Sequence, residues 1–153
     1  MTEKGAGEVR LGKLPNGNRF ITSIEPMHGN EVVINPEAKS GLWSQNRVVI
    51  DDSLSQGHAL VTGDFLGLGY DQVAAGWRQK TGEDKKVGIR LYVPTNKDGS
   101  EWKQHALIDD NTMACEDMKA ADLDGDGDLD LVAAGRATKN VVIYWNKTIA
   151  GPK

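Results

Sequence analysis

The sequence predicts an all-β protein built from repeated units of four short antiparallel strands, and three observations lead to this prediction. Segments recur in one order at one offset: Val49–Asp52 returns 58 residues later as Leu107–Asp110, and Asp64 returns as Asp122. Short runs rich in β-branched residues alternate with turn residues, which is typical of strands rather than helices. The 18 glycines suit the many tight turns that such a chain needs.

The strands can be assigned copy by copy along the chain. In the first copy, which is the weakest, Phe20–Ile24 and Val32–Ile34 read as the second and third strands, and Gln45–Ile50 reads as the fourth. The strands expected in the middle copy are Ala59–Phe65, Gln72–Ala75, Gly88–Val93 and Trp102–Ile108. Those expected in the last copy are Met118–Leu123, Leu129–Ala134 and Val141–Trp145, with no fourth strand.

Four antiparallel strands at this period are the pattern of a β-propeller blade. We therefore expect one propeller-type domain over residues 1–153, with blades at residues 5–52, 53–110 and 111–147. About two and a half blades make an incomplete ring, which leaves apolar faces without a neighbour. Three arrangements stay open: a homo-oligomer that completes a propeller, a longer chain that carries the missing blades, or an open stack. We expect an oligomer.

Composition excludes several classes of function. The net charge is −4 and no basic stripe is present, so a nucleic-acid partner is not expected. No apolar run approaches the ~20 residues of a membrane span. The first ten residues lack the apolar stretch of a secretory signal, which predicts a cytosolic protein or a mature or truncated form. The single cysteine, Cys115, excludes an internal disulfide and is expected to be a packed residue.

An acidic loop is the most specific local feature. Five aspartates alternate with other residues in Asp122–Asp130, and two glycines lie between them. Carboxylates this close repel one another, and a hard cation such as Ca²⁺ removes the repulsion because it takes six to eight oxygen ligands at ~2.3–2.6 Å. The glycines permit the turns that bring successive side chains to one point. The alternative interpretation is a solvated turn without a metal.

The segment Asp122–Gly135 (Asp-Leu-Asp-Gly-Asp-Gly-Asp-Leu-Asp-Leu-Val-Ala-Ala-Gly) resembles the FG-GAP/VCBS-type repeat of Ca²⁺-binding β-propellers. Its relatives usually have six or seven blades, and a subset resembles the propeller part of aldos-2-ulose dehydratase. The resemblance implies an extracellular or periplasmic, secreted protein. It also implies a ligand set made of the side chains of Asp122, Asp124, Asp126 and Asp130 and the carbonyl of Asp128.

The other copies depart from this pattern. Leu66 and Leu68 stand where the middle copy should have carboxylates, and Pro15–Asn18 occupies the place in the first copy. We therefore expect one Ca²⁺ per chain, in a structural role that orders the last blade.

Successive strands of a blade run in opposite directions, and this topology predicts a second polar group on the face opposite the acidic loop. His58 and Glu116 open first strands one period apart, and His28, Arg78 and Arg136 lie in or beside the loops between second and third strands. We assign His28, His58 and Glu116 as candidate catalytic or transition-metal residues. The candidate ligand-binding residues are Trp77, Arg78 and Arg136. The alternative is that each of these residues only caps a loop or a strand end.

Two functions follow from these features. The favoured one is a Ca²⁺-stabilised binding or interaction module for carbohydrate or protein ligands. The other is a sugar lyase or dehydratase that uses the polar group opposite the Ca²⁺ loop. Binding is favoured because the sequence has no nucleophile elbow, phosphate loop or close pair of sugar-cleaving carboxylates.

The recurring Trp43, Trp102 and Trp145 are expected to pack between blades, and the Asp51 and Asp109 pairs are expected to form turns.

Overall fold

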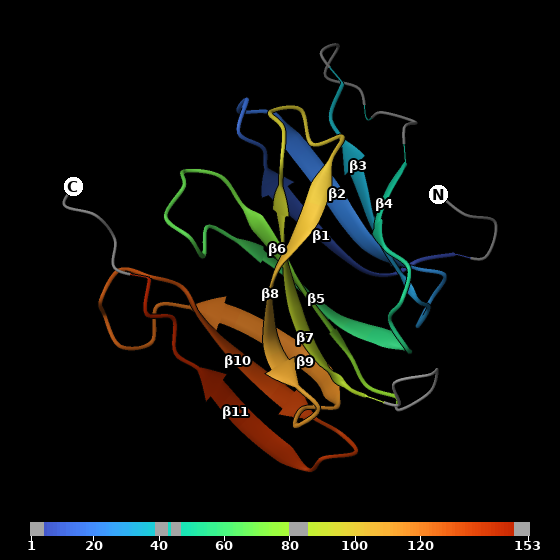
Figure 1. The fold of residues 1–153 in the computed structure, drawn as a ribbon, viewed down its shortest axis with the longest axis vertical. Coiled ribbons are helices and arrows are strands. Elements are labelled where there is room, and N and C mark those ends of the chain that lie inside the picture. The colour runs from blue at the N-terminus through green and yellow to red at the C-terminus, as the bar shows by residue number, and fades with distance from the viewer. Residues whose placement is uncertain (1–4, 39–42, 44–46, 80–85, 149–153) are drawn as a thin grey trace.

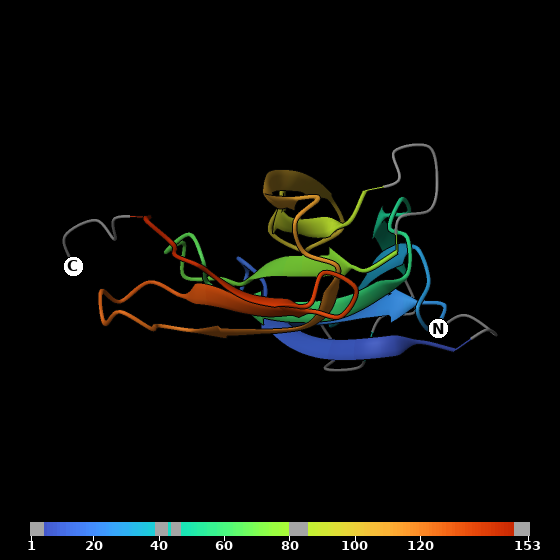
Figure 2. The ribbon, with the colours of Figure 1, turned by 90° about the horizontal axis from the view of Figure 1, so that it is seen from below.

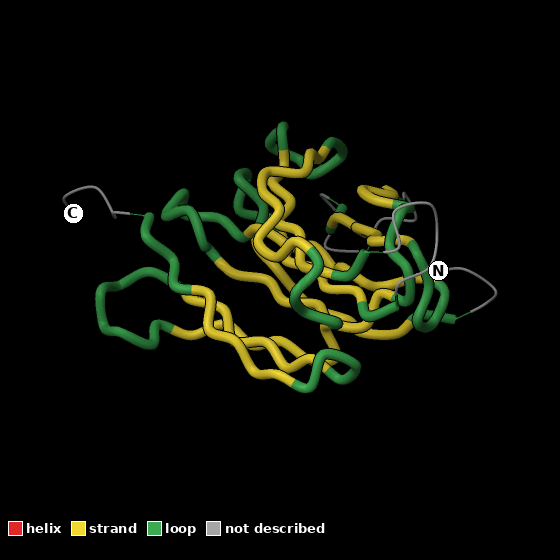
Figure 3. Tube along the Cα trace, turned by 60° about the horizontal axis from the view of Figure 1, so that its bottom comes forward, coloured by secondary structure: helices red, strands yellow, loops and turns green. Residues whose placement is uncertain are grey.

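The computed structural model describes residues 5–38, 43, 47–79 and 86–148, and these residues form strands and loops without a helix (Figures 1 and 3). Three antiparallel sheets follow one another along the chain. The first sheet contains β1 (Gly7–Lys13), β2 (Arg19–Glu25), β3 (Glu31–Pro36) and β4 (Val48–Asp51). The second contains β5 (Gly57–Gly63), β6 (Gln72–Trp77), β7 (Gly88–Pro94) and β8 (Trp102–Asp110). The third contains β9 (Cys115–Ala121), β10 (Asp130–Gly135) and β11 (Asn140–Tyr144).

Within each sheet the strands are paired in chain order, so every connection joins adjacent strands. The expected strands of the middle and last copies are confirmed to within a few residues, and the third sheet has no fourth strand among the described residues. The first copy is more complete than expected, because Gly7–Lys13 supplies a first strand. Part of the expected strand Gln45–Ile50 lies outside the described residues, and β4 begins at Val48. The sheets do not close into a ring.

The second sheet is covered on both faces. One core lies between the first and second sheets and includes Phe20, Leu60 and Tyr92. Another lies between the second and third sheets and includes Leu91 and Met118. Every residue of β6 is buried, which explains its continuous apolar run Val-Ala-Ala-Gly-Trp, since a strand buried on both faces has no reason to alternate.

The first strands of the three sheets lie side by side, with β5 between β1 and β9 (Figure 1). Gly76 on β6 marks the closest approach of β9, because a Cβ there would lie 2.6 Å from the Cβ and Sγ atoms of Cys115. Cys115 is buried, and burial together with nearby carboxylates raises the pKa of its thiol to about 12. It is therefore a packing residue, as expected.

An aspartate at the end of each fourth strand joins its sheet to the next one. The Tyr92 hydroxyl on β7 donates to the Asp51 carboxylate, and the Tyr144 hydroxyl on β11 donates to Asp109 at 2.9 Å. The same carboxylates accept backbone N–H groups in the following turns, at 2.7 Å for Ser53 and 2.9 Å for Thr112. The expectation that these aspartates form turns is confirmed, and each also accepts a hydrogen bond from a tyrosine of the neighbouring sheet.

Hydrogen bonds set the ionisation of Asp51. Burial opposes its charged form, but hydrogen bonds from Tyr92, Ser53 and Arg90 outweigh this cost and place its pKa below the usual value. A carboxyl with a lowered folded-state pKa stabilises the fold above its unfolded pKa, and this contribution is lost as the pH falls.

Replacing Tyr92 by Phe should lower the free energy of unfolding by about 1–3 kcal/mol, because a buried carboxylate loses a donor. Tyr144→Phe should cost less, since the Tyr144 ring is only partly buried. Urea denaturation at neutral pH and near pH 4 checks both values. The Tyr92 variant should lose less stability than the wild type on acidification, and an unchanged unfolding midpoint would contradict the proposed sheet-to-sheet role.

Candidate metal loop and polar cluster

The acidic loop joins β9 to β10 and projects at one end of the molecule (Figure 2). The Asp122 carboxylate organises its backbone by accepting the N–H groups of Gly125 at 2.7 Å and Gly127 at 3.0 Å. Both glycines have positive φ, 80° and 95°, a conformation that residues with a Cβ rarely adopt. The aspartate at the loop start and the two glycines therefore dictate its path.

Three carboxylates converge in this loop. One oxygen from each of Asp122, Asp124 and Asp130 lies within 4.8 Å of the others, and no other described His, Cys, Asp or Glu side chains form such a group of three. Asp130 is fully buried and accepts the backbone N–H groups of Leu123 at 3.0 Å and Asn146 at 2.8 Å. The loop is thereby tied to both β10 and the segment that follows β11.

The other two loop aspartates lie differently. Asp126 is exposed, lies outside the convergent group and accepts the backbone N–H of Asp128 at 2.9 Å. The Asp128 side chain is buried, and its pKa is raised by desolvation and by repulsion from the other four carboxylates. Lys147 lies 3.2 Å from Asp124, and this hydrogen bond lowers the pKa of Asp124. The converging ligand atoms of Asp122, Asp124 and Asp130 are carboxylate oxygens, so the loop fits a hard divalent cation.

The corresponding loop of the second sheet keeps the backbone bonds but not the carboxylates. Asp64 accepts the N–H groups of Leu68 at 2.8 Å and Gly69 at 2.7 Å, as Asp122 does in the acidic loop. The Leu66 N–H donates to the Gln72 amide oxygen at 3.0 Å, where the acidic loop uses Asp130. Hydrogen bonds within the protein thus close this loop, and its leucines offer no cation ligand.

At the other end of the same strands, four predicted residues come together. His58 lies on β5, Glu116 on β9, Arg78 directly after β6, and His28 in the loop between β2 and β3. Arg78 Nη1 donates to both Glu116 carboxylate oxygens, at 2.6 and 2.7 Å, and Arg78 Nη2 lies 3.2 Å from His28 Nδ1. The two imidazole rings lie 4.5 Å apart between centroids, at 57°. We call these four residues the polar cluster.

Hydrogen bonds fix the tautomers in the polar cluster. His58 Nδ1 lies 2.7 Å from the Glu116 carbonyl oxygen and must carry a proton, since a carbonyl only accepts. His58 Nε2 then faces the Glu116 carboxylate at 3.8 Å. His28 Nδ1 accepts from Arg78, so its proton lies on Nε2 when the ring is neutral. The cluster is closed by its own contacts, and the three predicted catalytic residues do not form a group of convergent metal ligands.

The charge of Glu116 is stabilised by its neighbours. Partial burial opposes ionisation, but hydrogen bonds from Arg78 and the charges of His58, Arg78 and Arg136 outweigh it, and the pKa of Glu116 lies below its usual value. A carboxylate with a lowered pKa is a weak base. The cluster therefore presents a neutralised ion pair beside two imidazoles.

An open pocket of about 330 Å³ adjoins the polar cluster. Its lining residues are Gln56, Arg78, Gln79, Arg136 and Ala137. Arg136, predicted from its place in the last copy, is exposed and has no ion pair among the described residues. Sequence reasoning missed both glutamines, because neither belongs to a motif and only their proximity to His58 and Arg78 marks them.

Trp77 does not join these residues. Its side chain is buried in the core between the first and second sheets, and its indole N–H donates to the Lys86 carbonyl at 2.8 Å. The Arg90 guanidinium lies over the Trp77 ring, 4.7 Å from its centroid. Consecutive strand residues point to opposite faces. Arg78 and Trp77 consequently diverge, and the structure places Trp77 in packing rather than at the pocket.

The three recurring tryptophans also differ from one another. Trp102 packs edge to face against Phe20 of the first sheet, with centroids 5.3 Å apart, as expected for packing between sheets. Trp43 and Trp145 are 38% and 48% exposed, so they do not fill a core.

No family model matches the sequence, and no curated protein matches it. None of the described residues belongs to a helix that is long and apolar enough to cross a membrane.

Arg78→Ala should raise the pKa of Glu116, because the substitution removes both hydrogen bonds and the adjacent charge. Arg136→Ala should raise it less, since Arg136 acts on Glu116 through charge alone. A carbon-detected NMR titration of the Glu116 carboxyl group checks both shifts. Equal shifts in the two variants, or no shift in either, would show that the Arg78 contact does not control this carboxylate.

Proposed function

We propose that the chain is a Ca²⁺-stabilised binding module built from propeller-type blades of the FG-GAP/VCBS kind. The convergence of Asp122, Asp124 and Asp130 carries the proposal, because it gathers hard oxygen donors at the position that the motif predicts. The adjacency of β1, β5 and β9 supports it as well, since first strands lie side by side around a propeller axis.

In this proposal the converging carboxylates of Asp122, Asp124 and Asp130 hold the ion, and the motif adds the Asp126 side chain and the Asp128 carbonyl as further ligands. Bound Ca²⁺ neutralises the mutual repulsion that raises the pKa of Asp128. Asp130 also accepts the Asn146 N–H, so the ion fastens the end of β11 to the loop. The role is structural, because all the ligands come from one short segment and no substrate position is needed to complete the set.

An exposed loop of this kind suits surroundings rich in calcium. Extracellular Ca²⁺ modules bind with dissociation constants of about 10⁻⁴–10⁻³ M, far weaker than cytosolic sensors. The loop lies at the surface and includes several solvent-exposed carboxylates. We therefore propose an extracellular or periplasmic location.

Ca²⁺ at a hundredfold excess over its dissociation constant should stabilise the fold by about 2.7 kcal/mol, through mass action on the folded state. Asp124→Asn should lower the Ca²⁺ affinity at least tenfold and so reduce this stabilisation. Asp117→Asn, at an exposed position on β9, should leave the stabilisation unchanged. Calorimetric melting with Ca²⁺ or with chelator checks these outcomes. A wild type whose melting temperature ignores Ca²⁺ would refute the metal assignment.

We further infer that the pocket beside the polar cluster binds an anionic or polyhydroxylated ligand, with an acidic carbohydrate as the expected class. The Arg136 guanidinium supports this, because it has no ion pair among the described residues and offers a planar set of donors that matches a carboxylate. The Gln56 amide oxygen accepts from Arg78 Nε at 3.2 Å, and the Gln56 amide N–H groups and the Gln79 amide suit hydroxyl groups.

Binding is favoured over sugar elimination at this site. Elimination needs a base that removes a proton from carbon. Glu116 is a poor base, since Arg78 holds both of its oxygens and its pKa is lowered. The basic nitrogen of a neutral His58 is Nε2, which faces the Glu116 carboxylate at 3.8 Å, and His58 does not line the pocket. In this proposal Glu116 and His28 position Arg78 at the edge of the pocket.

Uronate-containing oligosaccharides should bind the chain, and Arg136→Ala should weaken binding about tenfold by removing a charge-assisted contact. Arg19→Ala is the matched control, because Arg19 lies on the first sheet and pairs with Glu37. Isothermal titration checks the affinities, and chromatography of the recovered sugar checks for turnover. Unsaturated sugar products would overturn the binding assignment in favour of a lyase.

A further inference from the structure

The outer edge of β11 has no partner strand among the described residues. In the first and second sheets the third strand is flanked by a fourth, β4 beside β3 and β8 beside β7. In the third sheet β11 is the last strand of the described residues and pairs there with β10 alone. The exposed apolar residues here are Val141 at 72%, Ile143 at 42% and Trp145 at 48%. A free edge of this kind offers unpaired backbone groups to another strand.

The register identifies where a fourth strand would begin. Tyr92 and Tyr144 occupy matching positions, since each donates to the aspartate that ends the preceding fourth strand. Two residues further along, Pro94 in the second sheet therefore corresponds to Asn146 in the third. Pro94 lies opposite Trp102, the first residue of β8. A fourth strand on the third sheet would place its first residue opposite Asn146.

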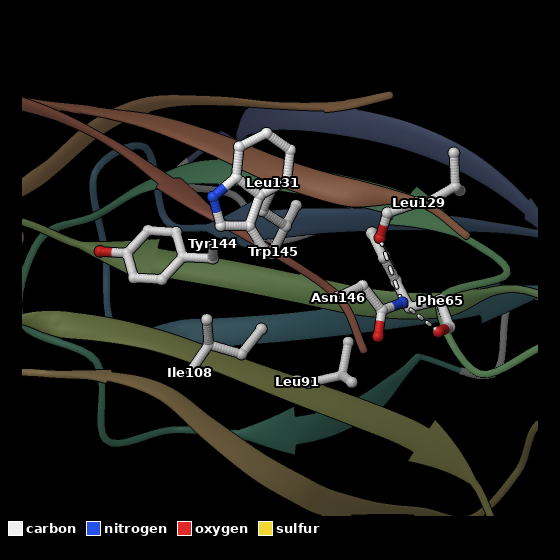
Figure 4. Close-up of a pocket in the computed structure, with 8 residues that line it drawn as sticks. All are labelled: Phe65, Leu91, Ile108, Leu129, Leu131, Tyr144, Trp145 and Asn146. Atoms are coloured by element: carbon white, nitrogen blue, oxygen red, sulfur yellow. Dashed lines mark hydrogen bonds between the residues drawn. The ribbon is translucent and has the colours of Figure 1, made fainter. Parts of the chain in front are cut away.

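An apolar pocket of about 120 Å³ opens at this same position (Figure 4). It lies between the second and third sheets, and its lining residues are Phe65, Leu91, Ile108, Leu129, Leu131, Tyr144, Trp145 and Asn146. The Asn146 amide donates to the carbonyls of Phe65 at 2.6 Å and Leu129 at 3.2 Å, so its donors are used within the wall. What the pocket offers is apolar surface.

The matching place between the first and second sheets is filled. Trp102 lies there against Phe20, beside the buried Leu14. Leu14 and Phe65 correspond, because each is two residues beyond a paired glycine, Gly12 on β1 and Gly63 on β5. The indole at the start of a fourth strand thus closes this space in one interface. In the other interface the described residues include no fourth strand, and Trp145 lines the pocket and is 48% exposed.

We propose that the β11 edge and the adjoining pocket bind an extended segment of a partner polypeptide that has the chemistry of β8. The segment pairs with β11 through its backbone and inserts an indole into the pocket beside Asn146. Both halves of this interaction already occur in the molecule, as the β7–β8 pairing and as the packing of Trp102. Strand addition gives affinity through main-chain bonds and specificity through the pocket.

A peptide with the sequence of Ser100–Asp110 tests the proposal, because it reproduces β8. Added to the full chain in Ca²⁺ buffer, it should bind saturably at one site, measured by titration calorimetry. Trp102→Ala in the peptide should weaken binding about tenfold, since the pocket loses its occupant. Gln104→Pro in the peptide should also weaken it, because proline cannot donate to a strand ladder.

Protein variants test the site itself. Trp145→Ala alters the pocket at an exposed position and should weaken peptide binding, whereas Leu11→Ala, exposed on the first sheet, should not. Amide NMR shifts caused by the peptide should map to β11 and the pocket walls, and the spectra also verify that each variant is folded.

Three results would overturn the proposal. One is absence of binding by a folded chain, and another is equal binding of the unsubstituted and Trp102→Ala peptides. The third is a sedimentation mass of two chains that Trp145→Ala reduces to one, which would assign the edge to a second copy.

Discussion

The structure depends on each sheet being covered by its neighbour. The second sheet has both faces covered, and for this reason β6 is buried at every residue. Within the part of the chain that the structure describes, the third sheet has one covered face, three strands and an exposed final strand. It is also the sheet whose loop gathers five aspartates. The third sheet, which is packed on one face, thus carries the acidic loop that a bound cation can order. The second sheet, which is packed on both faces, closes its equivalent loop with a hydrogen bond from the Leu66 N–H to Gln72.

The polar cluster depends on the same packing. His58 belongs to the second sheet and Glu116 to the third, and the bond between His58 and the Glu116 carbonyl spans the interface. Arg78 reaches Glu116 from the second sheet and His28 from the first. The pocket beside the cluster is therefore a product of how three sheets meet. A change in the sheet-to-sheet angle would separate these groups without altering any strand.

Much of the architecture could be predicted from the repeat, because equivalent segments form equivalent strands. The first strand, Gly7–Lys13, carries no such signal, because Val9 and Leu11 face outward and charged residues flank them. Three of the loop carboxylates converge as the spacing predicts. The strand order brings His58, Glu116 and Arg78 together. Trp77 lies in the core on the other face of β6, because neighbouring strand residues point to opposite faces. The pocket glutamines carry no sequence signal.

The central claim is that the third sheet is ordered by one Ca²⁺ in the acidic loop. Crystals grown with Ca²⁺ and measured at a long X-ray wavelength test it most directly, because calcium scatters anomalously there. The account predicts one anomalous peak per chain, bounded by the carboxylates of Asp122, Asp124 and Asp130. It predicts none in the loop that contains Leu66 and Leu68. Ordered carboxylates around a site with no peak at saturating Ca²⁺ would contradict it.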